Sequence, residues 1–83
     1  MFVKWKKHSK VRFAERAAML GINYGDIEFE VRKQKVKVEL GNGKIKTIFI
    51  VGDFFITVIK IEDFERIYII TIWVCANCFV GFV

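Results

Sequence analysis

Residues 35–51 read Lys-Val-Lys-Val-Glu-Leu-Gly-Asn-Gly-Lys-Ile-Lys-Thr-Ile-Phe-Ile-Val, and this stretch decides the fold. Val36, Val38 and Leu40 alternate with charged residues, which predicts a half-buried strand. Gly41-Asn42-Gly43 is the strongest turn signal in the chain, because glycine and asparagine tolerate the positive φ angles of tight hairpins. Residues 44–51 then return as the second strand of a hairpin.

Two further turns continue this pattern towards the C-terminus. Gly52-Asp53 separates the second strand from a third strand at residues 54–61. Residues 62–65 then separate the third strand from a fourth strand at residues 66–74. The chain contains no proline, so no strand is interrupted. The second half of the sequence therefore predicts a four-stranded antiparallel meander.

The first third of the chain has a different pattern. Residues 2–6 alternate and predict a short edge strand, and Ser9, or else His8, is suited to begin a helix that Gly21 ends. Asn23 can cap a second helix, but residues 26–32 are ambiguous. Their strict alternation slightly favours a strand, whereas Ile27 and Val31 also have helical spacing. Helices followed by strands predict one α+β domain over residues 1–83, with an apolar tail at residues 75–83.

The first helix gathers charged side chains on one side. On a helix, His8, Arg12, Glu15 and Arg16 fall within an arc of about 100°, and Val11, Ala14, Ala17 and Ala18 lie across from them. An acid/base group would then lie beside two guanidinium groups. Any surface helix has a charged side, however, so the pattern alone also fits a solvated face.

The net charge of +5 is concentrated at the N-terminus. Residues 1–20 carry six cationic residues and one acidic residue, Glu15, while residues 21–83 carry eight of each sign. Such a patch attracts polyanions, nucleic acid above all, although a solvated lysine-rich terminus has the same composition. The lysines concerned, which would bind phosphates, are Lys4, Lys6, Lys7 and Lys10.

Two tryptophans and two cysteines are the other notable residues. Trp5 and Trp73 are able to stack a nucleic-acid base, although we expect a core or interface role for Trp73. Cys75 and Cys78 form a single Cys-x-x-Cys pair, which is half the ligand set of a structural zinc site. Buried reduced thiols are therefore the expectation, ahead of an intermolecular zinc site or a disulfide. We expect no metal and no cofactor.

The ends of the chain suggest a location. The N-terminus lacks the apolar stretch of a signal peptide. Residues 67–83 are uncharged and approach the length of a membrane span, but they are rich in β-branched and aromatic residues. We therefore expect a final core strand with an apolar tail, in a cytoplasmic protein. Because 54% of the residues are hydrophobic, more than so small a core can bury, we also expect a homodimer.

Several of these residues together resemble a family of small uncharacterised domains related to the BrnT toxins and, more distantly, to RelE and ParE. The matching residues extend over residues 2–74, and they are His8, Arg12, Glu15, Arg16, Gly21-Ile22, Asp26-Ile27 and Ile70-Thr71-Ile72-Trp73. The resemblance implies a RelE-like α+β fold and a helix, not a strand, near residues 24–32. Relative to the family, Ala17 to Leu20 lengthen the first helix by about one turn.

The resemblance also implies a function. Toxins of this superfamily commonly cleave RNA through attack by the ribose 2′-hydroxyl, without a metal. In this chain His8 would transfer protons, Arg12 and Arg16 would hold phosphate, and Glu15 would act as a base or pair with Arg12. RNA and a small acidic antitoxin protein are the implied partners. Two alternatives remain: a non-catalytic nucleic-acid-binding domain, and an interaction module that dimerises through its apolar C-terminal strand.

Overall fold

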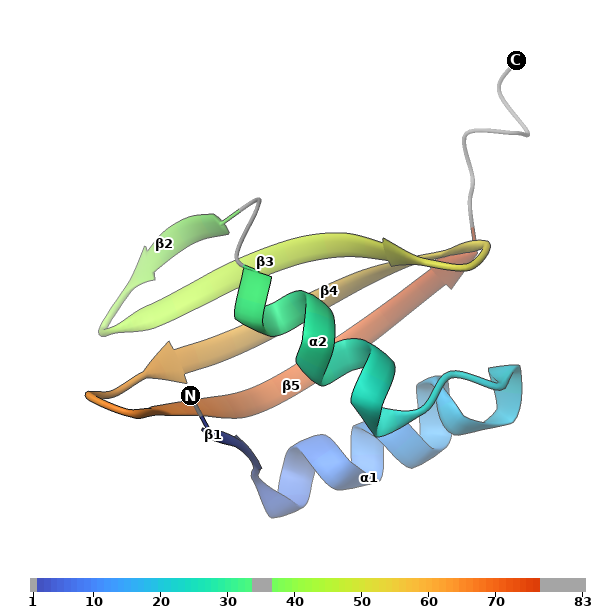
Figure 1. The fold of residues 1–83 in the computed structure, drawn as a ribbon, viewed down its shortest axis with the longest axis horizontal. Helices are drawn as coiled ribbons and strands as arrows, with labels where there is room; N and C mark the ends of the chain where they lie inside the picture. Colours follow the sequence, from blue (N-terminus) through green and yellow to red (C-terminus); the bar gives the residue numbers. More distant parts are fainter. Residues whose placement is uncertain (1, 34–36, 77–83) are drawn as a thin grey trace.

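The structure is a computed structural model that describes residues 2–33 and 37–76, and it has the expected α+β fold. The described elements follow in the order β1 (Phe2–Trp5), α1 (Lys7–Arg16), the 3₁₀ turn η1 (Ala18–Leu20), α2 (Tyr24–Lys33), β2 (Lys37–Gly41), β3 (Lys44–Val51), β4 (Phe54–Glu62) and β5 (Arg66–Ala76). Both helices precede the meander, as the sequence predicts (Figure 1).

The strands form one mixed sheet in the order β1-β5-β4-β3-β2. Strands β2 to β5 are the predicted antiparallel meander, and β1 adds an edge strand parallel to β5. The predicted glycine turn is confirmed, since Asn42 has a φ of 54° and Gly43 a φ of 76°. The parallel pairing of β1 was not expected, because periodicity carries no information on which strand an edge strand joins.

The helices lie on one face of the sheet, which we call the covered face. Helix α2 crosses in front of the strands in Figure 1, and α1 runs beside β5. The strand residues of the covered face that are fully buried form the core with residues of both helices, and they are Ile56, Val58, Ile67, Ile69 and Ile72. The core is thus a single layer between sheet and helices.

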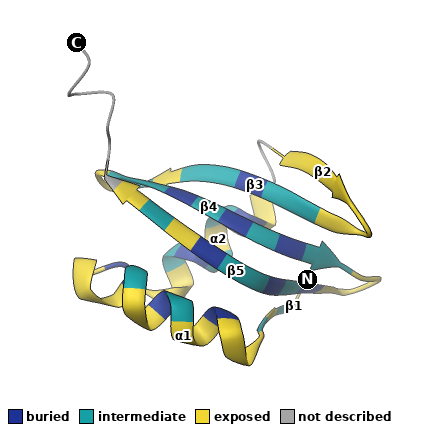
Figure 2. Ribbon diagram, turned by 180° about the vertical axis from the view of Figure 1, so that it is seen from behind, coloured by how far each residue is buried: buried dark blue, intermediate teal, exposed yellow. Residues whose placement is uncertain are grey.

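The opposite face has no helix across it, and we call it the open face. Figure 2 shows the sheet from this side, with α2 behind it. By strand alternation and register, its residues include Phe2 and Lys4 on β1, Val38 on β2, Lys44, Lys46, Ile48 and Ile50 on β3, Phe55, Thr57, Ile59 and Ile61 on β4, and Arg66, Tyr68, Thr71, Trp73 and Cys75 on β5. All of them are exposed or only partly buried.

Helix α1 differs from its sequence prediction in three ways. It begins after Lys6, and the buried Ser9 donates a hydrogen bond from its Oγ to the Lys6 carbonyl at 2.7 Å instead of acting as the N-cap. It ends at Arg16, so the expected extra turn is the 3₁₀ turn η1, which Gly21 closes with a φ of 79°. Its buried residues are Ser9 and Phe13, whereas Val11 and Ala14 are exposed. The bulk of Phe13 decides which side packs on β5.

Helix α2 resolves the ambiguous stretch, and the strand interpretation from alternation is wrong. Ile27 and Val31, one helical turn apart, are both fully buried against the sheet. Asn23 caps the helix, because its Oδ1 accepts a hydrogen bond from the Asp26 N–H at 3.0 Å. The Asp26 carboxylate accepts one from the Asn23 N–H at 3.4 Å in return. Local capping and burial at helical spacing outweigh the alternation.

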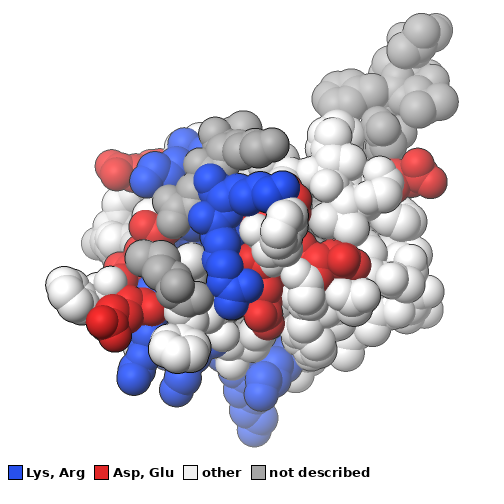
Figure 3. Space-filling view, in the orientation of Figure 1, with Lys and Arg blue, Asp and Glu red and all other residues white. Residues whose placement is uncertain are grey.

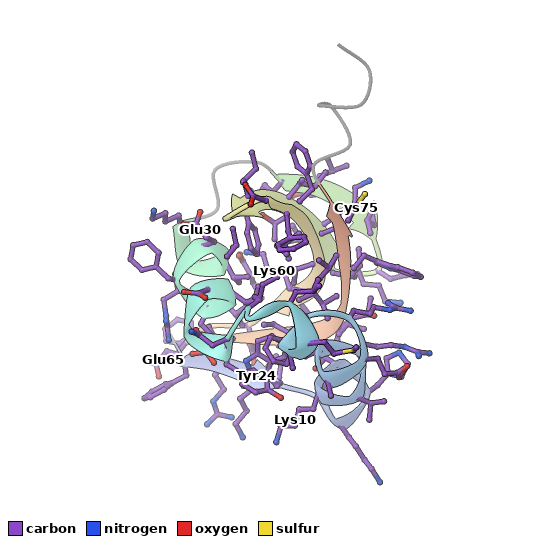
Figure 4. The ribbon with its side chains drawn as sticks, turned by 90° about the vertical axis from the view of Figure 1, so that its right-hand side faces the viewer. Lys10, Tyr24, Glu30, Lys60, Glu65 and Cys75 are labelled. Carbon is purple, nitrogen blue, oxygen red and sulfur yellow. The ribbon has the colours of Figure 1, made fainter. Side chains whose placement is uncertain are left out.

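The core contains one charged side chain. Lys60 is fully buried on the covered face of β4, between α2 and the sheet (Figure 4). Its Nζ donates hydrogen bonds to Glu62 Oε2 at 2.8 Å and to the Val31 carbonyl at 3.4 Å. Val31 lies in the last turn of α2, where the backbone carbonyls lack helical donors and carry partial negative charge. The ammonium group therefore ties the end of α2 to the sheet.

Strand β2 lies at the far edge of the sheet, and the expectation that it is half-buried is wrong. All five of its residues, Lys37 to Gly41, are exposed. An edge strand with no helix over it buries neither of its faces, so its alternating pattern produces no burial here. The expected final core strand is confirmed by β5, and no described helix has the length and hydropathy needed to span a membrane. Residues 77–83 of the predicted tail lie outside the described residues.

Candidate nucleic-acid interface

Three of the four residues singled out on α1 form a contiguous row. The Arg12 Nε–H donates to His8 Nε2 at 3.4 Å, and Arg12 also donates to both Glu15 carboxylate oxygens at 3.2 and 3.4 Å. Their spacing of three and four residues along one helix produces these contacts. The row lies on the surface, since 34% of the Arg12 side chain and 50% of the Glu15 side chain are exposed.

Arg16 lies apart from this row and contacts β5. Its guanidinium group donates a hydrogen bond to the Ile72 carbonyl at 2.8 Å, and its Cζ lies 3.6 Å from the centre of the Trp73 ring. β1 pairs with β5 only as far as Ile69, so Ile72 lies on a part of β5 that β1 does not cover. Arg16 therefore satisfies an edge carbonyl of the strand while stacking on an aromatic ring.

Trp73 is 55% exposed, so of the expected core or interface role the core role is wrong, and the interface role stays a prediction. Strand β5 is apolar along both of its faces, so its sequence predicts that both faces are buried. Only one face is covered by helices, however, and Trp73 is on the other. Its ring is accessible beside the Arg16 guanidinium group.

Trp5, in contrast to Trp73, packs between the sheet and the helices. Its ring meets those of Phe13 and Tyr24 edge-on, at centroid distances of 5.4 and 4.7 Å, and its Nε1 donates to Glu28 Oε2 at 2.9 Å. These contacts join β1, α1 and α2 on the covered side. These contacts give Trp5 a packing role. Of the two tryptophans, Trp73 is therefore the better candidate for stacking a base, because its ring is exposed.

The four N-terminal lysines lie on the outside of β1 and α1. Lys4 is opposite Tyr68 in the register, and Lys6 Nζ lies 5.1 Å from the centre of the Tyr68 ring. Lys7 and Lys10 are exposed on the first turn of α1, and Lys10 is labelled at the lower end of the molecule in Figure 4. In Figure 3 lysine and arginine side chains gather at the lower edge, where α1 begins. All four lysines are therefore exposed, along β1 and the first turn of α1.

Tyr68 and Arg66 are site residues that sequence analysis missed. The side-chain hydrogen bond with Tyr68, followed by electrostatic interaction with Tyr68 and with Asp63, raises the pKa of Arg66 above its ordinary value. Arg66 therefore stays cationic at any physiological pH. The signal that could have identified these two residues is their alternation on β5, which puts both on the face that Lys4 also occupies.

Charge on the open face has a single sign. Its cationic strand residues are Lys4, Arg66, Lys44 and Lys46. The acidic residues within the described strands are Glu39 and Glu62, and the register assigns both to the covered side. The open face thus combines exposed aromatic rings with cations and has no acidic strand residue among those described.

Other chemistry has less support in the described residues. None of them form a cluster of three or more His, Cys, Asp or Glu side chains able to hold a metal ion. Cys75 is exposed on β5, so the expectation of a buried thiol is wrong for this residue, and Cys78 lies outside the described residues. A surface hollow of about 480 Å³ is lined by Phe2, Arg32, Phe64 and Glu65, none of which the sequence singled out.

Comparison of the chain with protein-family models, with curated proteins and with solved structures finds no match. The resemblance to BrnT, RelE and ParE toxins therefore stays a prediction from the sequence. The geometry of the N-terminal lysines and of the α1 row is what bears on function.

Proposed function

We propose that this protein binds RNA through the surface formed by β1, the exposed side of α1 and the part of β5 beside them, as far as Trp73. The observation that carries the proposal is the pairing of cations with aromatic rings on that surface. Lys6 lies over Tyr68, and Arg16 lies over the exposed Trp73. The cations of residues 1–20 account for the whole net charge of +5.

Charge and aromatic stacking make different contributions to the proposed RNA binding. Lysine ammonium groups neutralise backbone phosphates and release counterions, which supplies affinity without sequence preference. An exposed indole stacks an unpaired base, and the guanidinium group beside it contacts both the base and the phosphate. Stacking needs bases that are free of a duplex, so the expected ligand is single-stranded RNA.

A matched pair of variants tests this proposal. Binding of a fluorescein-labelled single-stranded RNA is measured by anisotropy for the wild type, for Lys6→Gln/Lys10→Gln and for Arg32→Gln/Lys33→Gln. Both double variants remove two positive charges, but the second removes them from the end of α2. We expect the first to weaken binding by about tenfold and the second to weaken it far less. Equal losses would contradict the proposal, because they would indicate a dependence on net charge alone.

A second candidate function is metal-independent cleavage of the bound RNA, and the row on α1 favours it. His8 and Glu15 contact Arg12 from opposite sides. One of the two would take the proton from the ribose 2′-hydroxyl, which attacks the adjacent phosphorus. The other would protonate the departing 5′-oxygen, and Arg12 would stabilise the negative charge of the phosphorane. The products are a 2′,3′-cyclic phosphate and a free 5′-hydroxyl.

The cleavage candidate has its own test. Single-stranded RNA is incubated with the protein in excess EDTA, with His8→Ala and Arg12→Ala as variants and with DNA of the same sequence as the control. Cleavage of RNA but not of DNA, with a cyclic phosphate end and with loss in both variants, supports the ribonuclease. Salt-sensitive binding without cleavage leaves the protein as an RNA-binding domain. An adjacent reading frame for a small acidic protein would support the toxin role, since such a partner would cover the same cations.

A further inference from the structure

Strand β2 presents an uncovered edge. It is the last strand of the sheet among the described residues and pairs with β3 on its inner side (Figure 1). All five residues are exposed, and the hydrophobic side chains of Val38 and Leu40 are 47% and 48% exposed. The outer edge of such a strand offers backbone donors and acceptors to another strand.

The charge pattern of β2 is complementary to itself. Lys37 and Glu39 point to one face of the sheet, with Val38 between them on the other face. When two copies pair in antiparallel fashion about Val38, each Lys37 lies opposite Glu39 of the other copy. Centring the pair on Lys37 or on Glu39 would instead set like charges opposite each other, which is destabilising. Among the described residues, the register centred on Val38 is the one of these three that pairs opposite charges without setting like charges opposite each other.

We propose that a second copy of this chain docks at this edge, with the two β2 strands antiparallel about a two-fold axis at Val38. The pairing joins two five-stranded sheets into one. It also keeps the helices of both copies on the same face, because residues that oppose each other point to the same side. Val38 of one copy then contacts Val38 of the other on the open face, beside Lys46 of β3.

This interface differs from the one that the apolar C-terminal strand suggests, because β2 and β5 are separated by β3 and β4 in the sheet. It is also independent of nucleic-acid binding, since none of the residues in the basic surface of β1 and α1 belongs to β2. The two open faces become one continuous surface, so Lys44 and Lys46 of both copies lie at its centre.

A charge-reversal experiment tests the register. The association state is measured by analytical ultracentrifugation over a range of concentrations for the full chain and for three variants. Glu39→Lys sets lysines opposite each other at both ends of the pair, and we expect it to raise the dimer dissociation constant by about tenfold or more. Lys37→Glu/Glu39→Lys restores opposite charges and should restore the dimer. Glu65→Lys changes the charge equally in the β4–β5 turn and should leave association unchanged.

A cross-linking experiment tests whether the two-fold axis passes through Val38. In a chain with Cys75→Ser and Cys78→Ser, Val38→Cys places a thiol opposite its own copy, within reach of a disulfide. Leu40→Cys places the thiol away from the two-fold axis, so that it does not lie opposite its own copy. We expect mild oxidation to link the Val38→Cys chains into dimers and to leave the Leu40→Cys chains largely unlinked. A monomer at every concentration, or a dimer that Glu39→Lys does not weaken and Val38→Cys does not link, would overturn the proposal.

Discussion

The two faces of the sheet have the same hydrophobic strands but different surroundings. On the covered face Ile56, Val58 and Ile69 are fully buried under the helices, and Lys60, the buried cation among the described residues, is paired with a carboxylate. On the open face the aliphatic residues are only partly buried, and Trp73 is 55% exposed. The cations there are spread along β1, β3 and β5, with no acidic strand residue among the described ones.

This difference indicates which face maintains the fold and which one is available for binding. A buried charge is tolerated on the covered face because its partners are fixed in place. Exposed cations beside aromatic rings contribute little to folding, so their presence on the open face is consistent with ligand binding. Substitutions on the covered face should therefore change stability, and substitutions on the open face and on α1 should change RNA binding.

The largest effect is expected at Lys60. Lys60→Ala removes an ammonium group that is 2.8 Å from Glu62 Oε2 and leaves the carboxylate without its partner. We expect the free energy of unfolding in urea to fall by about 3–5 kcal/mol. Lys60→Met combined with Glu62→Gln removes both charges while preserving volume, and it should cost far less than Lys60→Ala. A loss below about 1 kcal/mol for Lys60→Ala would contradict the structural role of the pair.

A pair of isoleucines compares the two faces directly. Ile69 is fully buried on the covered face, whereas Ile59, on the open face, is partly exposed. Ile69→Ala should lower the free energy of unfolding by about 2–5 kcal/mol, because it leaves a cavity in the core. Ile59→Ala should cost clearly less, because solvent can reach the site. Equal costs in urea denaturation would mean that the open face is covered in solution.

The next effect is on binding. Trp73→Ala removes the exposed ring next to Arg16 and should weaken binding of single-stranded RNA by about 1–3 kcal/mol, with little change in stability. Trp73→Phe keeps an aromatic ring and should retain most of the affinity. Fluorescence anisotropy gives the affinities, and thermal unfolding monitors the fold. Unchanged affinity in Trp73→Ala would contradict the proposal that a base stacks on the Trp73 ring.

The smallest effect is expected for the ion pair on α1. Arg12 and Glu15 are 3.2 Å apart on a solvent-exposed helix, where such pairs contribute less than about 1 kcal/mol. Glu15→Gln should therefore leave the free energy of unfolding nearly unchanged, in contrast to Lys60→Ala. A large loss in urea denaturation would give Glu15 a structural role that its exposure does not suggest.

Much of the fold follows from local signals in the sequence. The turn at Asn42-Gly43 needs positive φ angles that few residues adopt, and the turn signals at Gly52-Asp53 and at residues 62–65 separate the strands that follow. Helix α2 was harder, because its residues alternate as in a strand, and the deciding factors were the Asn23 cap and the burial of Ile27 and Val31. The exposure of β2 could not be predicted, since it depends on where the helices end.

The candidate site was predictable only in part. Helical spacing correctly brought His8, Arg12 and Glu15 together, because contacts at three and four residues are local. The contact of Arg16 with Trp73 joins residues far apart in the sequence, so no periodicity could indicate it. The partial burial of Trp5 and the exposure of Trp73 depend in the same way on which face the helices cover.

The salt dependence of RNA binding tests the central claim most directly. The dissociation constant for single-stranded RNA is measured from low to moderate salt for the wild type and for Lys4→Gln/Lys6→Gln/Lys7→Gln/Lys10→Gln. If these lysines contact phosphates, the slope of log affinity against log salt should become shallower by about 3, or about 0.7 for each lost contact. The same slope and affinity in both proteins would contradict the claim that the N-terminal surface binds nucleic acid.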